Sequence, residues 1–287
     1  MLDLRYTNVK EIPENYLGKL GKLQHLLLGY IKEGENQLAG TKLNVRKLTT
    51  NLKTLRAIEQ PEVIDDIRRV SNVVDLSVTG LTMERQQTFW ATLDEFEKLS
   101  SLGVAVTHRS DIRLQDCGVK LKKNLKRLRM EGLHSGLEKL GEFENLIDLT
   151  LASHKPIDIN SIPRLPNLLC LRLYGVCEET ILEIGLQGFD RLMKLVIGDM
   201  GKVERVQIGC AVIGTVATLK LSNLQLLKEV VYLKQDSNKK HSLLRWGNSK
   251  AEGCSRKVKL DQTIFLRRLN GVPVDNSPCL TIYNYDM

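Results

Sequence analysis

The most regular part of the chain reads Leu146-Ile147-Asp148-Leu149-Thr150-Leu151, and it returns as Leu168-Leu169-Cys170-Leu171-Arg172-Leu173. Both stretches follow the frame apolar-x-x-apolar-x-apolar. The last two apolar residues of the frame are two positions apart, so in an extended strand they point to the same side. The residues beside them point to the opposite side. The frame therefore predicts a short strand with one leucine-lined face and one variable face.

The same frame occurs along most of the chain. Its nine complete copies have as middle residues Leu26, Leu55, Leu76, Leu102, Leu128, Leu149, Leu171, Leu195 and Leu219, and Leu2 and Leu4 belong to an earlier, incomplete copy. Successive middle residues are 21 to 29 positions apart, a period typical of leucine-rich repeats. We therefore predict an α/β fold, a leucine-rich-repeat solenoid or horseshoe. A parallel sheet would line its concave side, and short helices or irregular segments would return over its convex side.

Three returning segments carry apolar residues at helical spacing. These stripes are Val63, Ile67 and Val70 after Pro61; Phe89, Leu93 and Phe96; and Leu133, Leu137 and Leu140. They predict core-facing helices rather than cofactor contacts. A further copy of the frame, Val203-x-x-Val206-x-Ile208, starts too soon after Leu195 for a full repeat. It indicates either a strand on the convex side or a shortened repeat.

The repeat pattern stops near residue 232. We therefore predict a domain of about ten repeats over residues 1–232 and an irregular or poorly ordered basic tail over residues 233–287. The tail holds ten Lys and Arg against five Asp and Glu, which is most of the net charge of +8. The first strand starts at Leu2, and no earlier segment covers its apolar end. We expect the chain to be the C-terminal part, or a truncated copy, of a longer receptor.

The sequence contains no recognisable catalytic or metal-binding motif. The six cysteines and five histidines lack metal-ligand spacing, and no Gly-x-Ser-x-Gly motif is present. We expect no catalytic residue, no metal and no cofactor, so the chain is not expected to be an enzyme. A run of about 18 apolar residues and a signal peptide are both absent from this sequence, which argues against a membrane span and secretion. Scattered cysteines and the lack of Asn-x-Ser/Thr favour the cytoplasm or the nucleus.

Outward strand positions are the candidate binding residues. The register of the frame places on the concave face Arg56, Arg127, Arg129, Asp148, Arg172, Tyr174, Lys194 and Lys220, together with Asp75 and Thr150. Arginine and tyrosine supply rigid, amphipathic contact area in protein interfaces. We therefore expect a protein-binding surface in the middle repeats. The basic run Lys120, Lys122, Lys123, Lys126, Arg127 and Arg129 is either a solvated segment or part of that surface.

Several stretches are more specific than a generic repeat. They are Leu2-Asp3-Leu4-Arg5-Tyr6-Thr7-Asn8-Val9-Lys10-Glu11-Ile12-Pro13, then Leu17 to Leu26, then Met193 to Val203, and Leu219-Lys220-Leu221-Ser222-Asn223-Leu224. Over residues 1–232 the chain resembles the leucine-rich-repeat region of plant nucleotide-binding disease-resistance proteins of the coiled-coil class. It contains no Gly-x-x-x-x-Gly-Lys-Ser/Thr loop, so the nucleotide-binding module of that family is absent from this sequence.

The resemblance implies a role in innate immunity. Repeats of that family sense a pathogen effector or a guarded host protein, and they contact the receptor's own nucleotide-binding module. One departure is the position where many leucine-rich repeats carry an inward asparagine, because it holds Thr7, Leu81, Thr107, Leu133, His154, Val176, Met200 and Leu224. The alternative function is substrate recognition in an F-box-type ubiquitin ligase. Nucleic-acid binding by the basic run and tail is a weaker third possibility.

Overall fold

The computed structural model describes residues 1–31, 38–59, 64–106, 111–132, 136–153, 155–185, 189–209, 215–233, 240–245, 261–266 and 280–284. The fold is mixed α/β, with parallel strands and a few short helices, as the α/β prediction requires. The chain divides into two compact units, Met1–Leu146 and Ile147–Met287. In the described part of the chain, no helix is long and apolar enough to cross a membrane.

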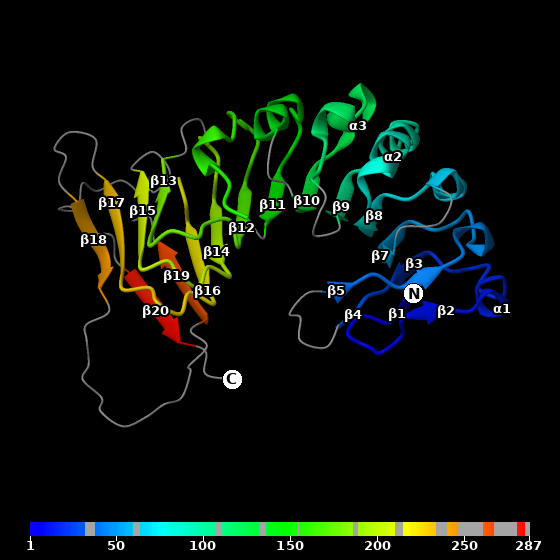
Figure 1. Cartoon of the computed structure of the whole chain (residues 1–287), viewed down its shortest axis with the longest axis horizontal. Coiled ribbons are helices and arrows are strands. Elements are labelled where there is room, and N and C mark those ends of the chain that lie inside the picture. Colours follow the sequence, from blue (N-terminus) through cyan, green and yellow to red (C-terminus); the bar gives the residue numbers. More distant parts are fainter. Residues whose placement is uncertain are drawn as a thin grey trace. The chain divides into compact units, whose positions relative to one another are not determined.

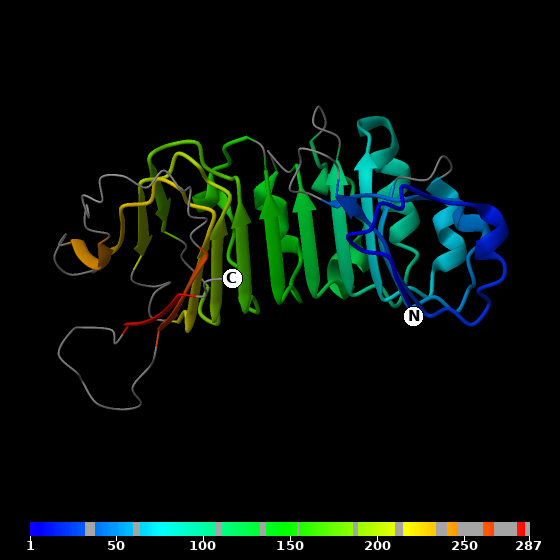
Figure 2. The same ribbon diagram turned by 90° about the horizontal axis from the view of Figure 1, so that it is seen from below.

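The first unit is built on parallel strands. Their order is β1 (Leu2–Asp3), β3 (His25–Leu27), β7 (Thr54–Glu59), β8 (Asp75–Leu81), β9 (Ser101–Val106) and β10 (Arg127–Glu131). The middle leucines of the frame pair directly from strand to strand, in the series Leu2, Leu26, Leu55, Leu76, Leu102 and Leu128. Figure 2 shows these strands running in one direction. Each copy of the frame is therefore one strand, paired in register with the next.

Short segments connect the strands of this unit. The helices are α1 (Glu14–Leu17), α2 (Gln86–Leu93) and α3 (Val119–Asn124), and the 3-10 segments are η1 (Val45–Lys47), η2 (Ile64–Val70), η3 (Met83–Arg85), η4 (Leu114–Asp116) and η5 (Leu137–Glu142). Two small sheets pair β2 (Glu11–Ile12) with β6 (Lys42–Leu43) and β4 (Tyr30–Ile31) with β5 (Leu38–Ala39). Helices α2 and α3 lie on one side of β8, β9 and β10 (Figure 1).

The predicted helical stripes are core residues. Phe89 and Leu93 on α2 and Phe96 just after it are buried, which confirms that stripe. The other two stripes fall on the 3-10 segments η2 and η5 because returns this short have room for only one or two turns. Their residues Ile67, Val70, Leu137 and Leu140 are buried. Val63 and Leu133 lie outside the described residues.

Polar contacts join consecutive returns. The backbone N–H of Leu121 in α3 donates to Asp94 at the end of α2, with an N–O distance of 2.9 Å. A Cβ atom at Gly118 would lie 2.0 Å from the carboxyl carbon of Asp94, so this close approach requires glycine. In the next return, Lys122 Nζ donates to Glu142 Oε2 at 2.6 Å. The returns are therefore fixed to one another by specific side chains as well as by their apolar faces.

The second unit begins with four parallel strands, β11 (Asp148–Ala152), β12 (Cys170–Tyr174), β14 (Lys194–Gly198) and β16 (Thr218–Ser222). Leu149, Leu171, Leu195 and Leu219 pair directly across them. The same sheet continues antiparallel with β19 (Asp261–Leu266) and β20 (Leu280–Asn284). The frame thus has the same structural role in both units.

A second sheet lies beside β12, β14 and β16 (Figure 1). Its order is β13 (Ile181–Ile184), β15 (Arg205–Gly209), β17 (Glu229–Leu233) and β18 (Lys240–Arg245), and only β18 is antiparallel. The irregular frame Val203-x-x-Val206-x-Ile208 therefore ends in a strand of this second sheet rather than in a shortened repeat. The return between β11 and β12 holds instead the 3-10 segment η6 (Ile159–Ser161).

Every apolar residue of the nine complete frames is buried. One copy departs from the expected register, because a bulge between Leu55 and Ile58 pairs Ile58, rather than Ala57, with Val78. Ala57 is the extra residue and has a φ angle of 54°. Such an insertion bends the strand and shifts its pairing by one residue.

Many strands end in the same turn. The residue two positions after the third frame residue has a positive φ angle in six copies, at Tyr6, Gly80, Gly132, Gly175, Asp199 and Asn223. The following position, where an inward asparagine was absent, holds buried apolar side chains at Leu81, Val176, Met200 and Leu224. Thr7 instead donates its hydroxyl to the carbonyl of Leu4 at 2.7 Å. Apolar burial therefore replaces an asparagine ladder at these four turns.

The predicted tail, residues 233–287, lies mostly outside the described residues. Its described parts are the end of β17 and the strands β18, β19 and β20, which extend the two sheets of the second unit. These segments form strands, whereas the sequence predicted an irregular or poorly ordered tail. The predicted boundary at residue 232 stays a prediction for the rest of the tail.

Candidate functional site

All eight predicted binding residues lie on the parallel strands, at positions that alternate with buried frame residues. Arg56, Arg127 and Arg129 belong to the first unit. Asp148, Arg172, Tyr174, Lys194 and Lys220 belong to the second. The predicted strip is therefore two sets of residues, one on each unit. Their part in binding stays a prediction.

Arg172 is the centre of the set in the second unit. On β12 it lies opposite Thr150 of β11 and Val196 of β14. Its guanidinium forms an ion pair with Asp148 and lies 3.5 Å from the hydroxyl oxygen of Thr150. Burial alone would lower the pKa of Arg172, but the hydrogen bond and charge of Asp148 outweigh it and raise the pKa. The guanidinium is therefore held in one place while 29% of the side chain stays exposed.

Tyr174 lies beside Arg172 on the same face of β12, and its ring packs against Gly198 of β14. A Cβ atom at Gly198 would lie 2.9 Å from Cδ1 of Tyr174 and 2.5 Å from the hydroxyl oxygen of Ser222. The tyrosine ring therefore packs directly on the backbone of β14. The ring is half-buried, so it presents a fixed aromatic edge to solvent. We call Asp148, Arg172, Tyr174, Lys194 and Lys220 the Arg172 surface.

The lysines of the Arg172 surface have no fixed carboxylate. Lys194 is exposed and Lys220 is half-buried, and neither has an ion-pair partner among the described residues. Cys170, between Asp148 and Lys194 in the register, is buried, and burial raises the pKa of its thiol. The thiol therefore stays protonated near neutral pH and is a poor nucleophile. The lysine ammonium groups and the tyrosine edge are the groups of this surface that remain open to solvent.

The set in the first unit is more open. Arg56 Nε donates to Asp75 Oδ2 at 3.0 Å, which fixes that guanidinium. Arg127 and Arg129 on β10 are exposed, and Arg129 lies 3.8 Å from Glu131. A Cβ atom at Gly103, opposite Arg129 on β9, would lie 2.8 Å from the hydroxyl oxygen of Ser77. Arg127 and Arg129 therefore lie opposite the small residues Ser101 and Gly103 of β9, which leaves their side chains exposed.

The basic run 120–129 is not one continuous patch. Lys120, Lys122 and Lys123 lie on α3, whereas Arg127 and Arg129 lie on strand β10. Lys122 is only 9% exposed and donates to Glu142. Helical spacing turns Lys122 toward the next return, which the sequence run alone does not reveal. Only Arg127 and Arg129 face the same side as the predicted binding strip.

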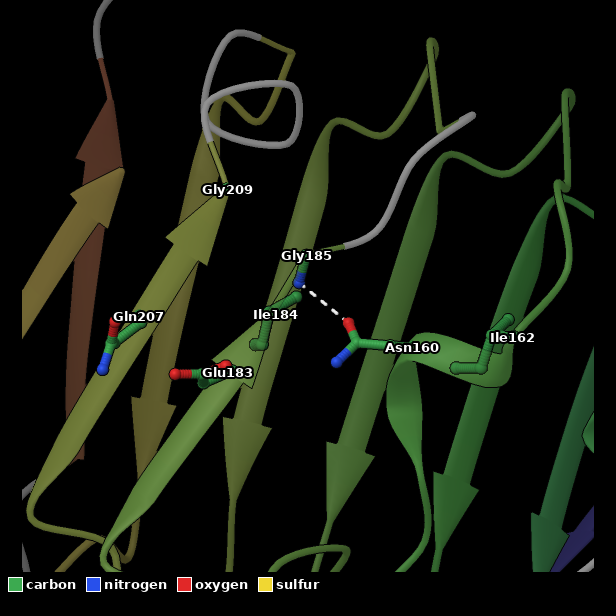
Figure 3. Close-up of a pocket in the computed structure, with 7 residues that line it drawn as sticks. All are labelled: Asn160, Ile162, Glu183, Ile184, Gly185, Gln207 and Gly209. Atoms are coloured by element: carbon green, nitrogen blue, oxygen red, sulfur yellow. Dashed lines mark hydrogen bonds between the residues drawn. The ribbon is translucent and has the colours of Figure 1, made fainter. Parts of the chain in front are cut away.

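The sequence did not indicate a hollow on the second sheet of the second unit (Figure 3). It has a volume of about 380 Å³ and is lined by Asn160, Ile162, Glu183, Ile184, Gly185, Gln207 and Gly209. Glu183 on β13 lies directly opposite Gln207 on β15. In the sequence, polar residues alternate with Leu182, Ile184, Val206 and Ile208. This alternation predicts two strands but does not predict a cavity beside them.

Among the described residues, no group of histidine, cysteine, aspartate and glutamate is arranged to hold a metal ion. No model of a known protein family matches the chain, and no curated protein matches it.

Proposed function

We propose that the chain is a leucine-rich-repeat solenoid that recognises another protein through the outer faces of its parallel strands. We further propose that it is the recognition region of an intracellular plant immune receptor. Its partner would be a pathogen effector, a guarded host protein or a nucleotide-binding module that this chain does not contain. The immune assignment rests on the sequence resemblance over residues 1–232.

The observation that carries the recognition role is that each strand has one buried face and one outward face. Frame residues are buried and pair in register from copy to copy, whereas the outward residues differ from strand to strand. A scaffold of this kind fixes the backbone while its outward side chains are free to suit a target. Arg172 and Tyr174 are already fixed by Asp148 and Gly198, so little side-chain freedom remains to be lost on binding.

The charge of the Arg172 surface indicates the kind of partner. Asp148 neutralises Arg172, and the two lysines remain available for carboxylates. A partner with acidic residues around an apolar group would complement this surface. Buried arginine and tyrosine contacts would supply most of the binding free energy, and the lysines would mainly raise the association rate.

Affinity capture from plant cells tests the proposal. The tagged chain would be compared with the double variant Arg172→Glu, Tyr174→Ala and with Lys202→Glu, a control whose exposed lysine lies before β15. We expect one protein partner to be captured by the wild type and the control, and at least about tenfold less by the double variant. Equal capture by all three folded proteins would reject the Arg172 surface.

The identity of the captured protein separates the alternatives. An effector, a guarded host protein or a nucleotide-binding module would support the immune receptor. A ubiquitin-ligase subunit would support the F-box reading. Nucleic-acid binding would instead give retention on polyanions that falls steeply with salt, whereas the proposed partner would still be recovered at high salt.

A further inference from the structure

The hollow on the second sheet lies where two kinds of return meet. The segment η6 is a 3-10 turn, and the next return is the strand β13. A turn cannot pair with the edge of a strand along its length, so a gap remains between them. Asn160 bridges one end of that gap, because its Oδ1 accepts the backbone N–H of Gly185 at 3.0 Å (Figure 3). The gap is therefore a fixed feature of the fold.

The polar side chains of the hollow have unused hydrogen-bonding groups. Gln207 is only 4% exposed, and its amide makes no hydrogen bond to another described residue. Glu183 is exposed, and its carboxylate likewise has no ion-pair or hydrogen-bond partner in the described part of the chain. Neither Gln207 amide atom is among the fully buried polar atoms without a partner, so the amide keeps access to the hollow and is available to a ligand.

The backbone of β13 adds further free groups. Among the described strands, β13 is the edge of its sheet and pairs only with β15. The Gly185 N–H points away from β15, toward Asn160, and backbone groups alternate along a strand. The N–H and C=O of Glu183 therefore also point to the open edge. An unpaired edge of this kind accepts an extended segment of another chain.

The chemistry of the hollow selects a cation. Its one charged side chain among the described lining residues is Glu183, and the Gln207 amide contributes a carbonyl oxygen. A guanidinium carries five N–H donors in a plane, so it can bond to both oxygen groups. An anion would be repelled by Glu183, and an apolar group would bond to neither polar side chain.

We infer that this hollow binds an arginine side chain of a partner polypeptide lying along the edge of β13. The carboxylate of Glu183 accepts the guanidinium in two parallel hydrogen bonds, and Gln207 Oε1 accepts a third. Gly185 and Gly209 keep the walls low enough for the side chain to enter. This site is separate from the Arg172 surface and gives the second unit a second point of recognition.

The probe for this inference is N-acetyl-arginine methylamide, titrated into the ¹⁵N-labelled chain. The amide resonances of Gly185 and Gly209, which line the hollow, report on binding. We expect saturable shifts with a dissociation constant in the millimolar range. The citrulline analogue has the same shape without the charge, and we expect it to give no saturable shift.

Variants locate the binding groups. Glu183→Gln should weaken binding of the probe by about tenfold, since it removes a charge-assisted hydrogen bond. Gln207→Met should weaken binding by a few-fold, and Glu179→Gln, an equal change of charge outside the hollow, should not alter it. The amide spectrum of each variant checks that it is folded.

Three results would overturn the inference: the absence of saturable shifts in the wild type, equal binding of arginine and citrulline probes, or wild-type affinity in Glu183→Gln. The variant Arg172→Glu should bind the probe like the wild type. A failure at the Arg172 surface and a failure at this hollow would therefore be told apart.

Discussion

Glycines at the strand ends and on the outer face set how closely consecutive copies of the frame approach. Gly175 has a φ angle of 64°, and a Cβ atom there would lie 2.3 Å from the carbonyl oxygen of Ser153. Its own N–H donates to the carbonyl oxygen of Gly198 at 3.1 Å. Gly175 is therefore required both by its backbone conformation and by the neighbouring strand end. At the same turn in other copies, Asp199 and Asn223 keep the positive φ angle.

Replacing two turn glycines separates these two requirements. Gly80 also has a positive φ angle, but a Cβ atom there would meet only the Glu59 side chain, at 3.8 Å. Gly80→Ala should therefore cost about 1 kcal/mol for its backbone conformation alone. Gly175→Ala adds a clash with backbone, so we expect a loss of about 3 kcal/mol.

Urea unfolding of the wild type and of both alanine variants would measure this difference. Equal destabilisation by the two substitutions would show that the close approach of Gly175 to Ser153 carries no cost. A pH change or salt should affect both variants alike, since neither substitution alters a charge.

Single residues also mark the limits of sequence reading. The alternation of Leu171, Arg172 and Leu173 predicts which side chains are buried, because strand geometry fixes it. The bulge at Ala57 was not predictable, because Leu55-Arg56-Ala57 fits the apolar-x-apolar pattern and gives no sign that Ile58 takes the pairing position instead. The seat of Tyr174 on Gly198 depends on the pairing of β12 with β14, which the sequence of one strand does not contain.

At the scale of elements, consecutive returns are joined by charged pairs as well as by apolar packing. The pair between Lys122 of α3 and Glu142 of η5 is the most buried of these contacts on its lysine side. The hydrogen bond and the charge of Lys122 lower the pKa of the Glu142 carboxyl. Because the folded state lowers this pKa, the ionised carboxylate stabilises the fold at neutral pH.

The stability contributed by Glu142 should therefore depend on pH. It is fully present above the unfolded pKa of a glutamate, about 4.3, and is lost as the pH falls through the lower folded pKa. Thermal unfolding near neutral pH should show Glu142→Gln to be less stable than the wild type. The difference should shrink once both proteins are measured at a pH below the folded pKa.

Glu138→Gln is the control, since it removes the same charge from an exposed position of η5, four residues away. A difference between the wild type and Glu142→Gln that stayed constant from neutral to acid pH would contradict the assigned role of the carboxylate.

A second set of contacts between elements was missed in the sequence. The residue just before the frame is often asparagine, and its amide donates to the preceding copy. Asn124 donates to the carbonyl of Glu97 at 3.3 Å, and Asn145 donates to that of Lys123 at 2.9 Å. These asparagines precede the strand, whereas the asparagine of many leucine-rich repeats follows it. The repeated Asn-Leu at the start of a frame was the available signal.

At the scale of the molecule, the sequence pattern is sufficient for the mixed α/β fold and the pairing of copies, because both follow from a repeated strand. The second sheet of the second unit was only partly predictable, since its short strands carry fewer frame residues than the main strands. The hollow between η6 and β13 depends on two returns taking different conformations. No single segment of the sequence encodes that difference.

Site-specific crosslinking tests the central claim most directly, namely that the outer face of the parallel strands is the recognition surface. A photoreactive residue would be placed at Lys220 on the Arg172 surface and, separately, at Lys202 away from it, in chains expressed in plant cells. The account predicts one crosslinked protein from position 220, lost when Arg172→Glu is added, and no such adduct from position 202. An adduct from position 202 with none from position 220 would contradict it.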